Sequence, residues 1–149
     1  MKKRVLFLCT ANSCRSQMAE GIINYFLGDK ISAFSAGTEA TCVNPTAIEV
    51  MKEIGIDISK HQSKNLTAFD GQSFDYVITL CGNVNETCPL YIGGTNKTHI
   101  GFDDPAKARG SKEEVMQEFR RVRDEIKEKL TAFFQAEFPP FLKGESMGI

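Results

Sequence analysis

Short apolar runs alternate along this chain with segments of helical periodicity, and this alternation restricts the possible folds more than any other feature. The runs Arg4–Cys9, Ile31–Ala36 and Tyr76–Cys81 have the length and composition of buried strands, and His99–Phe102 predicts a fourth, shorter one. Strands that alternate with helices predict a parallel sheet. We therefore expect an α/β fold, a three-layer sandwich in which a central four-stranded parallel sheet has helices on both faces.

Three segments carry the helical pattern. The first covers Ser16–Leu27. The second begins at Asn44-Pro45, an N-cap residue followed by proline, and ends at Gly55. The third opens at Ser111–Glu114, whose pattern predicts a capping box. Its predicted buried stripe consists of Val115, Phe119, Val122, Ile126, Leu130 and Phe133.

The composition is that of a globular protein, and we expect a single domain over residues 1–149 with a frayed tail from about residue 139. The formal net charge of −1 gives no reason to expect nucleic acid or a membrane surface as a partner. The first apolar run is too short for a signal peptide, and no run approaches the roughly 18 apolar residues of a membrane span. We predict a cytoplasmic monomer in which segment 56–71 is irregular and segment 82–96 is a loop or a weak helix.

Five cysteines are present, an odd number that argues against a structural disulfide framework in a cytoplasmic protein. They are Cys9, Cys14, Cys42, Cys81 and Cys88. Their spacing is unlike that of zinc sites, and His61 and His99 have no metal-ligand pattern around them, so we expect no metal site. Cys42 has no partner at a suggestive spacing and is expected to be structural or incidental.

The segment Cys9–Ser16, which we call the anion loop, separates a cysteine from an Arg-Ser pair by five residues, between a predicted strand and a predicted helix. A loop that closes on a helix N-terminus directs several backbone N–H groups into one concavity, where the helix dipole adds positive potential. Arg15 can hold two oxygens of a tetrahedral anion, and Cys9 would lie beneath that anion. The same field favours the thiolate of Cys9, to which the Ser16 hydroxyl can donate.

We assign oxyanion binding to the consecutive residues Thr10, Ala11, Asn12, Ser13, Cys14, Arg15 and Ser16. Asn12 tolerates the left-handed backbone conformation that a tight loop needs. The Cys14 side chain is expected to pack away from the anion. A buried strand cysteine near a surface arginine is the alternative interpretation of so short a pattern, but the position between a strand and a helix favours catalysis.

Two acids follow the fourth predicted strand in the sequence GFDDP, which covers Gly101–Pro105. Removing an oxygen from the anion requires a proton donor, and a carboxylic acid beside the anion loop can serve. Neighbouring acids repel, which favours the protonated form of one of them, and Pro105 restricts the backbone of Asp104. We predict Asp104 as the general acid and Asp103 as structural, with an ordinary polar turn as the alternative.

Cys81 and Cys88 lie seven positions apart, too far for a rigid strand to bring them together. The segment between them contains weak helix formers, so it can open and refold at little cost. A mobile loop would let Cys88 reach Cys81 once Cys81 has been oxidised. Cys81 ends a strand of the sheet that also carries Cys9, so its thiol could attack the Cys9 sulfur. Two unrelated buried cysteines are the alternative.

Together these residues resemble the thioredoxin-coupled arsenate reductases, which share the low-molecular-weight protein tyrosine phosphatase fold. The resemblance extends from Arg4 to about Leu130, and its motifs are CTANSCRSQMAEG, SAG, NPTAIEVM, TLCGNVNETCP, GFDDP and FRRVRDEI. It implies reduction of arsenate to arsenite by three cysteines, with thioredoxin as the electron donor and no bound cofactor.

The resemblance also implies an order of steps. Cys9 attacks arsenate, while Arg15 binds the oxyanion and Asp104 protonates the departing oxygen. Cys81 then attacks Cys9, arsenite leaves, and a Cys9–Cys81 disulfide remains. Finally Cys88 attacks Cys81, and thioredoxin reduces the resulting Cys81–Cys88 disulfide.

Some members of the resembled family bind potassium through residues that match Asn12, Glu20 and Ser35. In this chain Lys64, near Gln62, replaces the carboxylate that would complete such a site. The Lys64 ammonium could take the place of the cation, so potassium is possible but not expected to be required.

Two other functions stay open on the sequence. A low-molecular-weight protein tyrosine phosphatase would use Cys9, Arg15 and Asp104 without the relay, but residues 106–109 lack the aromatic side chains that such enzymes usually carry after Asp-Pro. A weak phosphatase side activity fits the same loop. A thiol sensor that captures arsenite or a soft metal through three cysteines would need neither an anion loop nor an acid.

Overall fold

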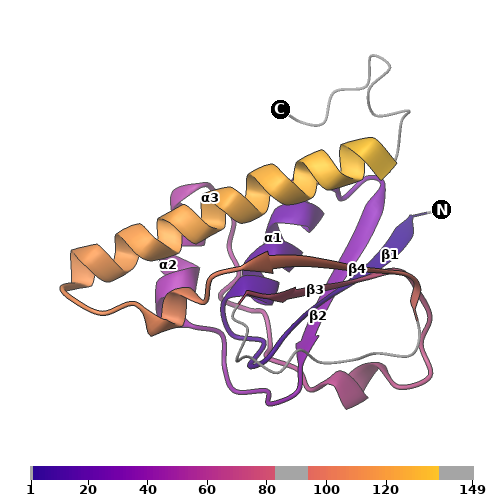
Figure 1. Cartoon of the computed structure of the whole chain (residues 1–149), viewed down its shortest axis with the longest axis horizontal. Coiled ribbons are helices and arrows are strands. Elements are labelled where there is room, and N and C mark those ends of the chain that lie inside the picture. Colours follow the sequence, from indigo (N-terminus) through magenta and orange to yellow (C-terminus); the bar gives the residue numbers. More distant parts are fainter. Residues whose placement is uncertain (1, 83–93, 138–149) are drawn as a thin grey trace.

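The computed structural model of the chain describes residues 2–82 and 94–137 (Figure 1). Within this part, four strands form one parallel sheet in the order β2-β1-β3-β4. The strands are β1 (Lys3–Cys9), β2 (Ile31–Gly37), β3 (Phe74–Cys81) and β4 (Gly94–Phe102). The α-helices are α1 (Arg15–Leu27), α2 (Pro45–Glu53) and α3 (Lys112–Glu137), and the 3-10 helices are η1 (Leu66–Phe69) and η2 (Pro105–Lys107). The predicted α/β class and the parallel sheet are confirmed.

The two faces of the sheet bury separate hydrophobic clusters. In β1, Val5 and Phe7 join the cluster that contains residues of all three α-helices, whereas Leu6 and Leu8 join a second cluster with Phe69 of η1. Side chains alternate between the faces of a strand, so this continuous apolar run is buried on both sides. The sheet thus lies between two layers in the described part of the chain: the α-helices cover one face and η1 packs on the other.

Strand β4 is longer than the sequence pattern predicted. It begins at Gly94 rather than at His99, so residues 94–96, which were expected to belong to a loop, are part of the sheet. Its first half is polar and exposed because β4 is an edge strand of the described sheet. Edge strands commonly carry polar residues that discourage pairing with other chains, and such residues conceal the strand from a hydrophobic pattern.

The long helix α3 starts as predicted and packs with a slightly different stripe. The capping box is confirmed, because Ser111 N donates to Glu114 Oε1 at 2.9 Å and Glu114 N donates to Ser111 Oγ at 3.1 Å. At the other end Phe134 is completely buried, whereas Phe133 is only partly buried. Phe134 follows Leu130 by four residues and therefore lies on the same helix face, so the predicted stripe was wrong by one position there.

Two features outside the strands support the expected local structure. Asn44 caps α2 by accepting hydrogen bonds from the backbone N–H groups of Thr46 and Ala47. Gly55, just after α2, has a φ of 82°, the left-handed conformation that favours glycine at a helix end. The segment 56–71, predicted to be irregular, contains the short helix η1, which Asn65 caps.

The carboxyl ends of the parallel strands share one edge of the sheet, and the chain's distinctive residues lie there. β1 ends at Cys9, β3 ends at Cys81, and Asp103 and Asp104 follow β4. β2 ends at Gly37, where a Cβ atom would lie 2.4 Å from the Thr10 carbonyl oxygen, so only glycine permits this close approach. No described helix is long and apolar enough to span a membrane.

Candidate active site

The anion loop turns its carbonyl oxygens toward the surrounding structure. Ala11 O accepts from Ser63 Oγ at 3.0 Å, and Ser13 O accepts from the Asn44 backbone N–H at 3.1 Å. In all, hydrogen bonds reach the carbonyl oxygens of Thr10, Ala11, Asn12, Ser13 and Cys14. The N–H and C=O of a trans peptide point in opposite directions, so the N–H groups of residues 11–15 face the concave side of the loop. This is the geometry of a backbone anion site at the start of α1.

An open pocket of about 320 Å³ lies over the concave side of this loop. It is lined by Cys9, Thr10, Ala11, Ser13, Cys14, Arg15, Asp104, Ala106 and Lys107. The structure therefore brings the predicted nucleophile, the predicted oxyanion-binding arginine and the predicted acid together. Asn12 and Ser16 do not line this pocket and are completely buried, so their side chains lie behind the loop.

Behind the loop, a directed chain of hydrogen bonds ends on the candidate nucleophile. The Cys9 sulfur lies 2.8 Å from Ser16 Oγ, and Asn12 Nδ2 donates to the same hydroxyl oxygen at 2.8 Å. Asn12 Oδ1 accepts from the Lys64 backbone N–H at 2.7 Å, which fixes which end of the carboxamide faces Ser16. The Ser16 proton is then available for a Cys9 thiolate. Asn12 has a φ of 49°, which confirms the predicted left-handed conformation.

Arg15 and Asp104 both line the pocket and lie close to each other. The Arg15 side chain is buried, and its Nη1 donates to the Phe102 carbonyl oxygen at 3.2 Å. Its Nη2 lies 3.8 Å from Asp104 Oδ2. Asp104 Oδ1 accepts from the Ala106 backbone N–H at 3.0 Å, so this carboxylate also caps η2. The guanidinium is thus held by the end of β4, and the acid by the loop that follows it.

The two adjacent acids have separate partners. Asp103 Oδ2 accepts from Arg121 Nη2 of α3 at 2.9 Å, and this pair is largely exposed. Asp103 does not line the pocket that holds Cys9, whereas Asp104 does. The contact with α3 agrees with the structural role predicted for Asp103.

Cys14 packs in the hydrophobic core and also borders the pocket. Its side chain belongs to the hydrophobic cluster under the α-helices, yet the residue also lines the pocket. Burial raises the pKa of the Cys14 thiol to about 12, so the thiol remains neutral near pH 7. The prediction that Cys14 packs away from the anion is therefore only partly right.

Cys81 is buried at the end of β3, next to β1 but outside the pocket. Leu8 pairs with Thr79, so Cys9 is level with Leu80, one residue before Cys81. With usual strand spacing and rise, the Cα atoms of Cys9 and Cys81 are about 6 Å apart. Regular alternation would nevertheless point the two side chains to opposite faces of the sheet.

The pairing of β3 with β4 becomes irregular at this same point, because the register shifts between Thr79 and Cys81. Such irregularities change the direction of a strand and re-aim side chains. Within the described residues, Cys81 forms no disulfide with Cys9, Cys14 or the exposed Cys42. Cys88 lies outside the described residues.

Comparison with known proteins identifies the family of this chain. The sequence model of the low molecular weight phosphotyrosine protein phosphatase family matches residues 4–138. The chain belongs to this family. Within the family it is similar to the arsenate reductase of Halalkalibacterium halodurans, with 52% identity over 132 residues that cover 89% of this chain and 95% of that protein.

Two solved structures extend the similarity to three dimensions. The first, described as an arsenate reductase in the phosphate binding state, has 37% identity and a TM-score of 0.75, and the match covers 89% of this chain and 96% of that one. The second is the thioredoxin-dependent arsenate reductase of Corynebacterium glutamicum, with 25% identity and a TM-score of 0.61 over 91% of this chain and 63% of that one. The chain is thus a phosphatase-family protein that groups with arsenate reductases.

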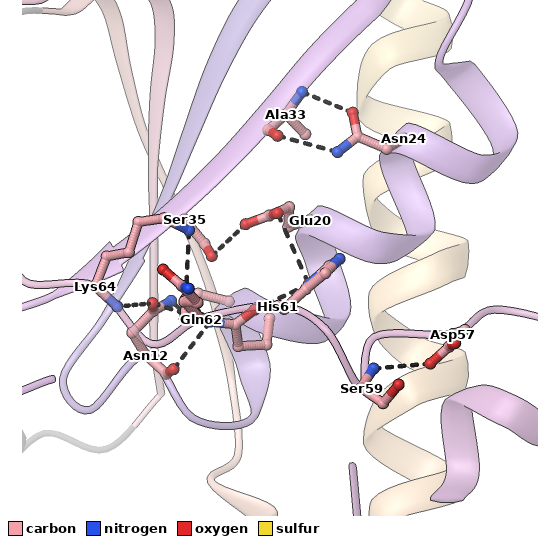
Figure 2. Close-up of polar contacts among 12 residues, drawn as sticks. Asn12, Glu20, Asn24, Ala33, Ser35, Asp57, Ser59, His61, Gln62 and Lys64 are labelled. Atoms are coloured by element: carbon pink, nitrogen blue, oxygen red, sulfur yellow. Dashed lines mark hydrogen bonds and ion pairs between the residues drawn. The ribbon is translucent and has the colours of Figure 1, made fainter. Parts of the chain in front are cut away.

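The residues that the resemblance associates with potassium are hydrogen-bonded in this chain. Ser35 Oγ donates to Glu20 Oε1 at 2.6 Å, and Asn12 Oδ1 is held by the Lys64 N–H (Figure 2). Lys64 Nζ donates to the Gln62 carbonyl oxygen at 3.3 Å. Ser35 Oγ, Glu20 Oε1 and Asn12 Oδ1 thus all take part in hydrogen bonds within the protein. In the described segments, no cluster of three or more His, Cys, Asp or Glu residues could hold a metal.

Sequence reasoning missed the residues that support the back of the loop in this family member. Gln17 is completely buried, and its amide nitrogen donates to Asn12 Oδ1 at 3.0 Å. His61, which has no metal-ligand pattern around it in the sequence, has its Nδ1 3.0 Å from Gln17 Oε1 and 3.7 Å from Glu20 Oε2. His99 lies away from the pocket and its Nδ1 is 2.7 Å from Thr79 Oγ1. Nothing in the sequence indicates that a glutamine in the first turn of a predicted helix supports the anion loop.

Proposed function

We propose that the protein is an arsenate reductase in which Cys9 is the nucleophile. The observation that carries the proposal is the pocket in which the Cys9 sulfur, the Arg15 guanidinium and the Asp104 carboxyl group converge on the N–H groups of the anion loop. Membership of the family supports this function, as does the similarity to arsenate reductases over nearly their whole length.

In the proposed first step, the pocket binds arsenate as a tetrahedral oxyanion. The inward N–H groups and Arg15 hold its oxygens, and the Cys9 thiolate attacks arsenic. An As–O bond breaks, and Asp104 supplies the proton with which that oxygen leaves as water. The Ser16 hydroxyl steadies the thiolate from the side that does not face the substrate.

The pocket favours a small oxyanion over a phosphotyrosine side chain. None of the described residues that line it is aromatic, and Ala106 and Lys107 form its side after Asp104. An aromatic ring would therefore find no stacking partner among these described residues. Phosphate and arsenate have the same shape and charge, so we also expect a weak phosphatase activity on small phosphate esters.

The reducing half of the reaction is proposed as a relay of thiols. The Cys81 thiolate attacks the Cys9 sulfur, the S–As bond breaks, and arsenic keeps the electron pair and leaves as arsenite. This attack requires the end of β3 to move, because Cys81 lies outside the pocket in the present structure. Cys88 then displaces Cys9 from the Cys9–Cys81 disulfide.

Thioredoxin is the proposed reductant of the resulting Cys81–Cys88 disulfide, and reducing cytoplasm is the proposed location. The name of the thioredoxin-dependent Corynebacterium glutamicum relative supports this choice. Potassium is not expected to be required, because Ser35 and Glu20 are hydrogen-bonded to each other and the Lys64 ammonium, which donates to the Gln62 carbonyl oxygen, supplies a positive charge.

Turnover of arsenate with thioredoxin, thioredoxin reductase and NADPH tests this proposal. Arsenite should form continuously and NADPH oxidation should match it mole for mole. Cys88→Ser should release one equivalent of arsenite and then stop, because the Cys9–Cys81 disulfide is trapped. Normal turnover of Cys88→Ser would contradict the shuttle, and activity only with glutaredoxin would replace the donor.

Two further results would change the assignment. A protein that binds arsenite at one equivalent without consuming reductant would be a sensor rather than an enzyme. A protein that hydrolyses phosphotyrosine efficiently and leaves arsenate unreduced would be an ordinary phosphatase of this family.

A further inference from the structure

Gln17 makes an unusual number of contacts for a single buried side chain. It is completely buried in the first turn of α1. Its Nε2 donates to the Asn12 carbonyl oxygen at 3.2 Å, to Asn12 Oδ1 at 3.0 Å and to the Gln62 carbonyl oxygen at 3.0 Å. One carboxamide thus connects the helix, the anion loop and the segment around Gln62.

The orientation of this carboxamide is determined by its surroundings. Two of its three acceptors are backbone carbonyl oxygens, which can only accept, so the nitrogen must face them. The oxygen end then faces His61 Nδ1 at 3.0 Å, which must carry a hydrogen. Glu20 Oε2, 3.7 Å from the same ring nitrogen, favours that hydrogen as well. Figure 2 shows His61 between Glu20 and the segment that contains Gln62.

The contacts of Gln17 bear on the candidate nucleophile through two further residues. Gln17 and the Lys64 N–H together hold Asn12 Oδ1, so Asn12 Nδ2 is directed at Ser16 Oγ. Ser16 Oγ, which lies 2.8 Å from the Cys9 sulfur, then has its own proton available for a Cys9 thiolate. If Asn12 turned, the Ser16 hydroxyl could donate elsewhere, and the thiolate would lose a charge-assisted hydrogen bond.

We propose that Gln17 is a positioning residue for the nucleophile, which holds Asn12 in the orientation that makes Ser16 donate to Cys9. This inference rests on the proposed role of Cys9. Gln17 touches neither the pocket nor the substrate position, and it acts only through Asn12 and Ser16.

The test compares Gln17→Met with Asn24→Leu. Methionine keeps the length and flexibility of Gln17 but has no donor for Asn12 or Gln62. Asn24 is the matched control, because it also lies on α1 and its carboxamide also bonds the backbone, with Ala33 N and Ala33 O at 2.8 and 3.0 Å. Figure 2 shows that pair away from the anion loop.

The readout is the rate at which iodoacetamide alkylates Cys9, followed by tandem mass spectrometry between pH 5.5 and about 10. At pH 6.5 we expect Cys9 of Gln17→Met to react at least about fivefold more slowly than Cys9 of the wild type. The reason is that a misdirected Ser16 hydroxyl would weaken the charge-assisted hydrogen bond to the Cys9 thiolate. Near pH 10, above the ordinary pKa of an accessible cysteine thiol, the rates at Cys9 should agree within about twofold. Asn24→Leu should follow the wild-type profile.

An unchanged alkylation profile in folded Gln17→Met would overturn the proposal. If that variant does not fold, Gln17→Glu keeps the size of the side chain while losing the amide donor, and the same comparison applies to it. The measurement needs no arsenate. A wild-type protein that fails to reduce arsenate would contradict the proposed function, and the alkylation profiles would still decide the role of Gln17.

Discussion

Two parallel strands of this sheet end in a buried cysteine, and the surroundings of the two sulfur atoms differ. At the end of β1, Cys9 begins a loop whose carbonyl oxygens are hydrogen-bonded outward, and its sulfur lies 2.8 Å from Ser16 Oγ. At the end of β3, Cys81 lies beside a shift in register and outside the pocket. The first site is held by many independent contacts, whereas the second lies where the register between β3 and β4 shifts.

This difference matches what the two thiols would have to do. A nucleophile that attacks a bound oxyanion benefits from fixed geometry, because the hydrogen bonds to the charged groups are then already in place. A thiol that must reach another sulfur and later pass its bond onward needs freedom to move. We therefore expect the end of β1 to be rigid and the end of β3 to move during the reaction. The following variants test this expectation.

The largest effect is expected from Cys9→Ser. Because serine is not ionised near pH 7, arsenate turnover should fall by about 10³-fold or more. Phosphate should still bind within a few-fold of the wild type, since the N–H groups of the loop remain. Both quantities can be measured by arsenite formation and by calorimetric titration. Cys42→Ser is the control, because Cys42 is exposed and outside the pocket, and it should retain wild-type turnover.

Cys81→Ser should separate the two halves of the reaction. Arsenite release should be abolished, while hydrolysis of a small phosphate ester, which needs only the pocket, should stay within about threefold of the wild type. A loss of both activities would show that the end of β3 supports the pocket itself and would contradict the separation. If Cys81→Ser retained both arsenite release and ester hydrolysis, Cys81 would have no role in the reaction.

Asp104→Asn should lower kcat by about 10²-fold, the usual contribution of a positioned general acid, with a smaller change in KM. Asp103→Asn is the matched control, since Asp103 pairs with Arg121 on α3 and does not line the pocket. Steady-state kinetics of both variants measure the contrast. Equal effects of the two substitutions would mean that the acid pair acts as a unit rather than through Asp104.

The same contrast explains which parts of the site were predictable from sequence. Cys9, Arg15 and Ser16 lie within eight consecutive residues, so their spacing alone indicates an anion loop between a strand and a helix. Asp104 follows a strand of the same sheet, and parallel strands bring their carboxyl ends to one edge. These predictions need only local patterns and one rule of topology.

Contacts between distant segments could not be predicted in this way. The bond from Gln17 to the Gln62 carbonyl oxygen spans 45 positions, and that from Lys64 to Asn12 spans 52. Each depends on how an irregular segment packs against α1, which no periodicity reports. The first half of β4 was missed because an exposed edge strand does not show the hydrophobic pattern of a buried one.

The smallest expected effect concerns Cys14, the second thiol of the rigid loop. Because burial raises its pKa to about 12, Cys14 should remain unalkylated at pH 8 while Cys9 reacts, and Cys14→Ala should change turnover by less than about threefold. This result would show that burial keeps one thiol of the loop unreactive while another thiol of the same loop reacts.

The stability of the protein offers a second measure of the same residue. A thiol with a pKa of about 12 when folded and 9.0 ordinarily holds its proton more firmly in the folded state. Its contribution is complete below pH 9 and is lost as the pH rises toward 12. Urea unfolding should therefore show the wild type losing stability relative to Cys14→Ala between pH 8 and about 10.5. The raised pKa of Tyr76 acts in the same range in both proteins and cancels, so a constant difference would mean that Cys14 is not desolvated in the folded loop.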